Sequence, residues 1–217
     1  MIICRTPFRI SFFGGGTDYP EWYKNNEGRV ISTTINKYSY INCRYLPPFF
    51  DYKFRIRYFK REETQIINEI KHPSVRECLN FLKFKKGVDI VHNADLPARS
   101  GLGSSSTFTV GLLHALYSLK NEMVAKKKLA NEAIHVEQNL IQENVGSQDQ
   151  TAAAFGLGSY RDSLPAAPAE SRALEQLPAM LQRHQYARQI PQPEPLGRSI
   201  ASRAGRFQKR PTRAACV

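Results

Sequence analysis

The sequence contains no apolar run that approaches the roughly 18 residues of a membrane-spanning helix. Its first residues do not form the basic start, apolar middle and small-residue cleavage site of a secretory signal. Cysteine is scarce, and no two cysteines form the C-x-x-C pair that is typical of zinc sites. The four cysteines are spread along the chain at Cys4, Cys43, Cys78 and Cys216. These absences predict a cytoplasmic protein with reduced thiols and no membrane contact.

The sequence does have the composition of a folded domain. Of its 217 residues, 41% are apolar and 23% are charged, which argues against a wholly disordered or fibrous chain. This length accommodates one domain or two small ones. The formal net charge of +12 suggests a nucleic-acid partner until its distribution along the chain is considered.

The excess of positive charge is concentrated near the C-terminus. Residues 157–217 hold 10 of the 31 Lys and Arg residues but only 4 of the 19 Asp and Glu residues, so half of the net charge lies there. This segment is rich in Arg, Ala and Pro, which GC-rich codons specify, whereas residues 1–156 are rich in Lys, Asn and Ile, which AT-rich codons specify. We expect residues 157–217 to be either a disordered, low-complexity tail or an out-of-frame segment.

Two periodicities divide residues 1–156 into strands and helices. Alternating or β-branched and aromatic residues predict strands at 10–13, 29–35, 38–45, 53–59 and 88–91. Apolar residues at helical spacing predict a short helix after Pro73 and longer helices at 105–119 and 126–143. Strands and helices of this kind predict a sheet with one solvent-exposed face and with helices packed on the other face.

A glycine- and serine-rich segment, residues 96–106, lies between a predicted strand and a predicted helix. Its sequence is LPARSGLGSSS. Glycines let backbone N–H groups point inward, a helix N-terminus adds partial positive charge, and serine hydroxyls can bond phosphate oxygens or ligate magnesium. The segment is not a Walker loop, because no Gly-Lys-Ser/Thr follows. It predicts a phosphate-binding loop, with a serine-capped helix start as the alternative.

Three motifs together resemble those of the GHMP small-molecule kinases, the superfamily of galactokinase, homoserine kinase, mevalonate kinase and phosphomevalonate kinase. The first is residues 5–19, RTPFRISFFGGGTDY, which is most similar to the opening of D-glycero-D-manno-heptose 7-phosphate kinases. The second is the phosphate loop within residues 97–106, and the third runs from Glu137 to Asp149-Gln150. The resemblance covers about residues 1–156.

The resemblance implies a role for each motif. The ATP phosphates would bind Pro97, Gly101, Leu102, Gly103, Ser104, Ser105 and Ser106. Mg²⁺ would be held by Ser105 and Glu137. Asp149 would be catalytic, accepting or orienting the proton of the substrate hydroxyl, with Arg9 holding it ionised and facing the phosphoryl group. A sugar or sugar phosphate would contact Thr17, Asp18 and Tyr19.

The resemblance also implies a fold and a boundary. The implied fold is α+β, a mixed sheet with helices on one face. It is that of the N-terminal domain of these kinases, which is ribosomal S5 domain 2-like. The phosphate loop would lie in a left-handed βαβ crossover. Residues 1–156 would be this ATP-binding domain, and residues 157–217 the tail. The family's third glycine-rich motif and its C-terminal half are not found in this sequence, so we expect exposed apolar surface and a chain truncated to the N-terminal domain.

The implied activity is phosphorylation of a sugar hydroxyl by ATP with Mg²⁺, with a heptose 7-phosphate as the expected acceptor. One alternative is a non-catalytic remnant that binds nucleotide or sugar phosphate without turnover. The other is a nucleic-acid binder acting through the Arg-rich tail, which lacks interleaved aromatic residues and any recognition module. None of these motifs predicts an oligomeric state.

Overall fold

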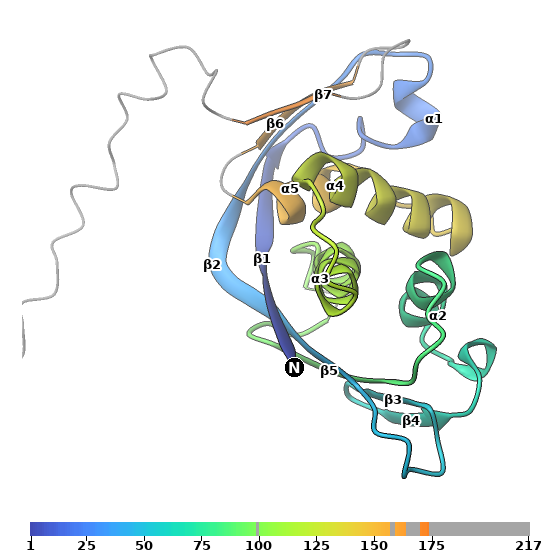
Figure 1. Ribbon diagram of the computed structural model, residues 1–217. Coiled ribbons are helices and arrows are strands. Elements are labelled where there is room, and N and C mark those ends of the chain that lie inside the picture. The colour runs from blue at the N-terminus through green and yellow to red at the C-terminus, as the bar shows by residue number, and fades with distance from the viewer. Residues whose placement is uncertain (99, 157–158, 164–169, 174–217) are drawn as a thin grey trace, which may run out of the picture. The chain divides into compact units, whose positions relative to one another are not determined.

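The structure, a computed structural model, describes residues 1–98, 100–156, 159–163 and 170–173. In this part of the chain a mixed sheet carries helices on one face (Figure 1). The strands are β1 (Ile2–Phe13), β2 (Gly28–Tyr45), β3 (Phe54–Arg57), β4 (Arg61–Thr64), β5 (Val88–Ala94), β6 (Ser159–Ser163) and β7 (Glu170–Ala173). The helices are α1 (Pro20–Tyr23), α2 (Pro73–Phe81), α3 (Ser104–Leu119), α4 (Lys126–His135) and α5 (Gln148–Phe155), with a 3₁₀ turn η1 (Ile67–Glu69) and a π-helical turn η2 (Val136–Leu140).

The long strand β2 is the centre of the sheet. Strand β1 pairs with it in antiparallel fashion, from Ile2 opposite Cys43 to Phe13 opposite Ile31. On the other edge of β2, β5 pairs with its C-terminal half and β6 with its N-terminal half. Strand β3 runs parallel to β5 and antiparallel to β4. The expected α+β fold with a mixed sheet is therefore confirmed.

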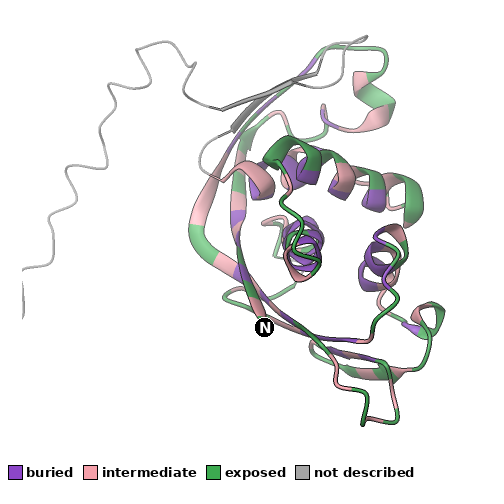
Figure 2. Ribbon diagram, in the orientation of Figure 1, coloured by how far each residue is buried: buried purple, intermediate pink, exposed green. Residues whose placement is uncertain are grey.

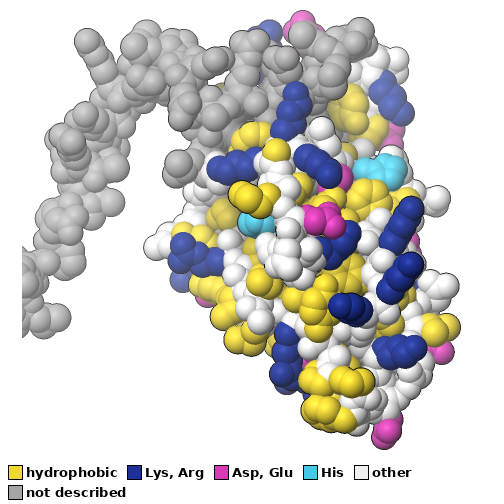
Figure 3. Space-filling view, in the orientation of Figure 1, with side chains coloured by type: hydrophobic (Ala, Val, Ile, Leu, Met, Phe, Trp, Pro, Cys, Tyr) yellow, Lys and Arg dark blue, Asp and Glu magenta, His cyan; other side chains and the backbone are white. Residues whose placement is uncertain are grey.

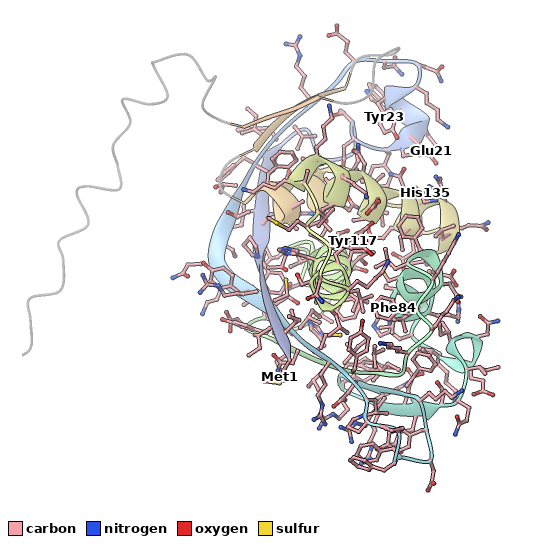
Figure 4. All side chains as sticks on the ribbon, viewed as in Figure 1. Met1, Glu21, Tyr23, Phe84, Tyr117 and His135 are labelled. Atoms are coloured by element: carbon pink, nitrogen blue, oxygen red, sulfur yellow. The ribbon has the colours of Figure 1, made fainter. Side chains whose placement is uncertain are left out.

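Helix α3 lies against this sheet and is buried over most of its surface (Figure 2). Leu112, Leu113 and Leu116 are fully buried, and the helix packs against β1, β2, α2, α4 and α5. A helix that is apolar around most of its circumference belongs inside a domain. Tyr117, labelled in Figure 4, ties α3 to α4 because its hydroxyl donates to Glu132 Oε2 at 2.7 Å. This packing fixes the N-terminus of α3, where the glycine-rich segment lies.

The structure differs from the sequence-based elements in several places: β1 begins at Ile2 instead of residue 10, and α1, β4, β6 and β7 were not predicted. The strands predicted at 29–35 and 38–45 are one continuous strand, β2. The helix predicted at 126–143 is α-helical only to His135 and continues as the π-helical turn η2. Helix α5 was not predicted at all, because its segment is short and has no clear apolar stripe.

Strands β6 and β7 lie after Gly156, in the segment that the sequence assigns to the tail. Strand β6 pairs with β2, and β7 pairs with β6. The rest of residues 157–217 lies outside the described residues, so the expected boundary at residue 156 stays a prediction. Within the described ranges, no helix is both long and apolar enough to cross a membrane.

The α3 core gives the first testable prediction. Leu113→Ala removes a fully buried side chain and leaves a cavity, so we expect the free energy of unfolding to fall by about 2–5 kcal/mol. Ile3→Ala, on the solvent face of β1, is the matched control and should change it by less than about 0.5 kcal/mol. Urea denaturation followed by circular dichroism measures both, and equal losses would contradict the assignment of Leu113 to the core.

The second prediction concerns pH. Burial, with a smaller contribution from the neighbouring His72, lowers the pKa of His92 to about 4, and its ring packs edge-on against Phe108. Because the folded pKa lies below the unfolded value, the stabilisation is present above about pH 6.5 and is lost as the pH falls towards 4. His92→Gln should reduce this loss by on the order of 2 kcal/mol.

The free energy of unfolding is measured by denaturation at pH 7 and at pH 4.5, and the acid loss is the difference between the two values. His135→Gln, which replaces an exposed histidine of α4, is the control and should retain the parent's acid loss. A His92→Gln variant that loses as much stability on acidification as the parent would refute the role of His92.

Candidate active site

The glycine-rich segment forms the turn between β5 and α3. Gly101 and Gly103 both have a φ of +75°, a left-handed conformation that glycine adopts at little cost. Gly103 is the N-cap of α3, and residues 104–106 form the first turn of the helix. The first N–H groups of a helix have no partner within the helix and attract anions. The predicted phosphate-binding residues thus lie in this turn or at this helix start.

Arg9 of β1 joins this turn to α5. Its Nε and Nη2 lie 2.7 and 2.6 Å from Asp149 Oδ1, and its Nη1 donates to the carbonyl oxygen of Gly101 at 2.9 Å. The backbone N–H of Arg9 also donates to the carbonyl oxygen of Leu102. The two side chains are only 11% and 22% exposed, so water screens the pair weakly. The structure therefore brings the two predicted catalytic residues together beside the predicted phosphate loop.

Asp149 lies in the first turn of α5. Burial raises its pKa above the ordinary value; Arg9 opposes this rise, and the neighbouring Asp18 carboxylate adds to it. Arg9 thus acts in the expected direction but does not outweigh burial. A raised pKa moves a carboxylate towards the range in which it accepts a proton effectively near neutral pH.

Glu137 lies in the π-helical turn η2 and is fully buried. Ser106 Oγ donates to its Oε2 at 2.7 Å, and Gln150 Nε2 donates to the same oxygen. Its other oxygen, Oε1, is buried and has no hydrogen-bond partner within the described ranges. Burial raises the pKa of Glu137. Since an unsatisfied buried carboxylate oxygen is costly, a cation at Oε1 would stabilise it, and Glu137 fits the predicted magnesium ligand.

The second predicted metal ligand, Ser105, is exposed at the start of α3. The serine that contacts Glu137 is its neighbour Ser106, which the sequence assigned only to phosphate. Gln150 was also missed as a partner of Glu137; its place directly after Asp149 was the available signal. Among the described residues, no cluster of three or more His, Cys, Asp and Glu side chains could hold a metal alone. A cation at Glu137 would therefore need oxygens from a ligand or water.

The predicted sugar-binding residues lie between the triple-glycine turn and α1. Thr17 Oγ1 donates to the Gly14 carbonyl oxygen at 2.8 Å. Tyr19 is the N-cap residue of α1. Asp18 is fully buried and accepts hydrogen bonds from backbone N–H groups. These three residues belong to the same motif as Arg9, and their contact with a sugar stays a prediction.

An open cleft of about 550 Å³ runs beside Arg9. It is lined by Arg9–Gly15, Gly101, Leu102 and Gln148, so it joins the first motif, the phosphate loop and the start of α5. Phe12 and Phe13, in its wall, are 58% and 74% exposed. A second hollow, of about 500 Å³ and lined by parts of α2 and α4, contains no predicted site residue. The cleft beside Arg9 is therefore where Arg9, Gly101 and Leu102 can meet a ligand.

Basic side chains on the described surface do not form one continuous stripe on the face that Figure 3 shows. On β3, Arg55 and Arg57 lie 2.6 and 3.7 Å from the buried carboxylate of Asp89, and Arg44 of β2 lies 3.0 Å from it. Burial alone would raise the pKa of Asp89, but these arginines lower it below its ordinary value. These arginine side chains thus stabilise the sheet. Most of the Arg-rich tail lies outside the described residues.

The close approach of the loop to α5 yields the third prediction. A Cβ on Gly103 would lie 3.1 Å from Asp149 Oδ2, whereas a Cβ on Gly156, at the far end of α5, would meet nothing within 4 Å. Both glycines have a positive φ, so alanine at either position costs about 1–3 kcal/mol of backbone strain and Gly156→Ala is a matched control. Only Gly103→Ala should also displace Asp149 and shift the NMR resonance of the Arg9 Nε–H group. Equal shifts in both variants would refute the close approach.

Comparison with known proteins relates part of this chain to a known family. Residues 68–157 match the family model for the GHMP kinases N terminal domain. Within these residues the chain is similar to a GHMP kinase N-terminal domain. The match includes the glycine-rich loop, Glu137 and Asp149, and it ends one residue after Gly156.

Relatives support the same family. The chain is 29% identical over 163 residues to D-glycero-alpha-D-manno-heptose 7-phosphate kinase of Campylobacter jejuni, a match that covers 70% of this chain and 48% of that enzyme. It is 28% identical to the galactokinase of Chloroflexus aurantiacus, covering 71% and 40%. The chain thus spans about half the length, or less, of the curated relatives it matches.

A solved structure supports the fold. The D-glycero-D-manno-heptose 1-phosphate kinase from Bacteroides thetaiotaomicron superposes with a TM-score of 0.70 at 22% identity, covering 79% of this chain and 59% of that one. The GHMP kinase N-terminal fold inferred from three short motifs is therefore confirmed.

Proposed function

We propose that this domain binds ATP with Mg²⁺ and takes part in transferring a phosphoryl group to a hydroxyl of a sugar or sugar phosphate. One observation carries the proposal: the Arg9–Asp149 pair lies directly against the Gly101–Gly103 turn. Phosphoryl transfer depends mainly on positioning and charge stabilisation, so a carboxylate and a cation beside a phosphate loop are the groups it needs. The relatives named above, which are sugar and sugar-phosphate kinases, support this reaction class.

The nucleotide phosphates would lie at the start of α3. There the N–H groups of the first helical turn, that of Ser106 included, and the hydroxyls of Ser104 and Ser105 can donate to phosphate oxygens, while the Ser106 hydroxyl donates to Glu137. Pro97 would shape the loop before the glycines, and Leu102 would shape it between Gly101 and Gly103. Glu137 and Ser105 would hold Mg²⁺, which when bound supplies positive charge to the phosphates. The unpartnered Glu137 Oε1 is the observation that favours this assignment.

The acceptor would lie in the cleft beside Arg9. Asp149 would accept or orient the proton of the attacking hydroxyl, and its raised pKa suits that role. Arg9 would fix Asp149 and face the charge that develops on the transferred group. Thr17, Asp18 and Tyr19 would border the sugar site. The expected acceptor is a heptose 7-phosphate, with its anomeric hydroxyl as the attacking group.

A second candidate function is binding without turnover. The observation that favours it is the exposure of Phe12 and Phe13 in the wall of an open cleft. Water is poorly excluded from such a site, and phosphoryl transfer benefits from its exclusion. Turnover measurements separate the two functions, because both predict nucleotide binding.

Nucleotide binding is the first test. The chain should bind ATP at least about tenfold more tightly with Mg²⁺ than without, a difference of about 1.4 kcal/mol. The double variant Ser105→Ala, Glu137→Gln should lose this difference, since it removes both proposed ligands. Ser118→Ala with Glu122→Gln changes the same residue types at the far end of α3 and should retain it. Calorimetric titration gives the affinities; a parent with equal affinities would contradict the metal site.

Turnover is the second test. With ATP and a panel of sugars and sugar phosphates, Asp149→Asn should lower kcat by about 10²- to 10⁴-fold with little change in KM, because the lost interaction belongs to the transition state. Asp51→Asn, an exposed aspartate distant from the cleft, is the control and should match the parent. Nucleotide binding without transfer to any acceptor would support the binding function instead, and an Asp149→Asn variant with the parent's kcat would exclude Asp149 from the mechanism.

A further inference from the structure

The carboxylate of Asp18 lies at the N-terminus of α5. Its Oδ2 accepts hydrogen bonds from the backbone N–H groups of Ser147 and Gln148, at 2.9 and 3.1 Å. Its Oδ1 accepts from the N–H of Gly16 at 3.1 Å, and Ser147 Oγ donates to the Asp18 carbonyl oxygen at 3.2 Å. These contacts join the triple-glycine turn after β1 to a helix that begins about 130 residues later in the chain.

The contact is closed to solvent. Asp18 is 0% exposed, and a Cβ placed on Gly146 would lie only 1.9 Å from its Oδ2. The backbone therefore approaches the carboxylate so closely that only glycine fits at position 146. A buried carboxylate that accepts three N–H groups, two of them at a helix start, is stabilised by charge-assisted hydrogen bonds and by the helix dipole. A sugar diol would have to displace these bonds to reach the same oxygens.

Helix α5 carries two site residues in its first turn. Asp149 forms the ion pair with Arg9, and Gln150 donates to Glu137 Oε2. Both side chains project from the turn whose first N–H groups bind Asp18. The position of Asp18 therefore sets where Asp149 lies relative to the phosphate loop and where Gln150 holds Glu137.

We propose that Asp18 is a positioning residue that anchors the first turn of α5, and through it Asp149, and that it does not bind the sugar itself. The proposal rests on the proposed kinase function and replaces the sugar-contact role expected for Asp18. It assigns the same task to Gly146, whose missing side chain makes room for the carboxylate. A displacement of α5 by about 1 Å would move Asp149 out of reach of the acceptor hydroxyl, a change that typically costs about 10²-fold in rate.

The experiment compares Asp18→Asn and Gly146→Ala with the parent chain. Both variants disturb the same contact from opposite sides. In each we expect the amide hydrogens of Ser147 and Gln148 to exchange at least about tenfold faster, and the NMR resonance of the Arg9 Nε–H group to shift. Where the parent transfers phosphoryl groups, kcat should fall by about 10²-fold while the sugar KM stays within about threefold.

The control is Glu69→Gln. Glu69 Oε2 also accepts two backbone N–H groups, those of Gln65 and Ile66, but on an exposed turn away from α5. This variant should leave α5 exchange, the Arg9 resonance and both kinetic constants unchanged. If Asp18→Asn and Gly146→Ala do not fold, Ser147→Ala, which removes only the hydroxyl bond to the Asp18 carbonyl, should show the same pattern with smaller amplitude.

The outcomes separate this proposal from the kinase function. A variant that raises the sugar KM, with kcat, Ser147 and Gln148 exchange and the Arg9 resonance unchanged, would restore Asp18 as a sugar contact and overturn the proposal. Absence of transfer by the parent to every acceptor would count against the kinase function alone. In that case unchanged amide exchange and an unchanged Arg9 resonance in the variants would still overturn the positioning role, and changes in both would support it.

Discussion

The burial of α3 against the sheet is the constraint on which the candidate site depends. A helix surrounded by β1, β2, α2, α4 and α5 cannot shift without opening the core, so its N-terminal turn is held at a fixed place. Arg9, on β1, and Asp149, on α5, both approach that turn from elements packed on the same helix. Residues that are distant in sequence thus reach one point because each is anchored to a common core.

Three carboxylates at or near this core, the buried Asp18 and Glu137 and the half-buried Asp149, are stabilised in different ways. Asp18 is bonded by backbone N–H groups, Asp149 by an arginine, and Glu137 by a hydroxyl and an amide that leave one oxygen unsatisfied. Among the described residues, both carboxylate oxygens of Asp18 have hydrogen-bond donors, whereas Glu137 Oε1 has none. An incomplete set of partners around a buried charge is what a ligand-binding carboxylate requires, and a complete set is typical of a structural one.

Much of the fold could be predicted from the sequence, because long segments such as 105–119 have apolar residues at helical spacing. The joined strand β2 was missed because Asn36 and Lys37 interrupt its apolar pattern while the backbone stays extended. Helix α5 was missed because its Ala-rich segment has no stripe. The motifs predicted which residues gather near the cleft. They could not predict that Ser106 contacts Glu137, or that Asp18 faces a helix start, because both depend on side-chain directions set by packing between distant segments.

The π-helical turn at Val136–Leu140 makes the geometry of the site depend on the number of residues in that turn. Such a turn contains one residue more than an α-helical turn, and π-bulges occur frequently at functional sites. Winding the same segment as an α-helix would rotate the connection from Leu140 to Ser147 by about 100° relative to Glu137. Because this connection leads directly into α5, the number of residues in the turn sets how Glu137 is placed relative to Asp149. Deleting one residue from the turn would separate the two carboxylates even though every side chain of the site remained in the sequence.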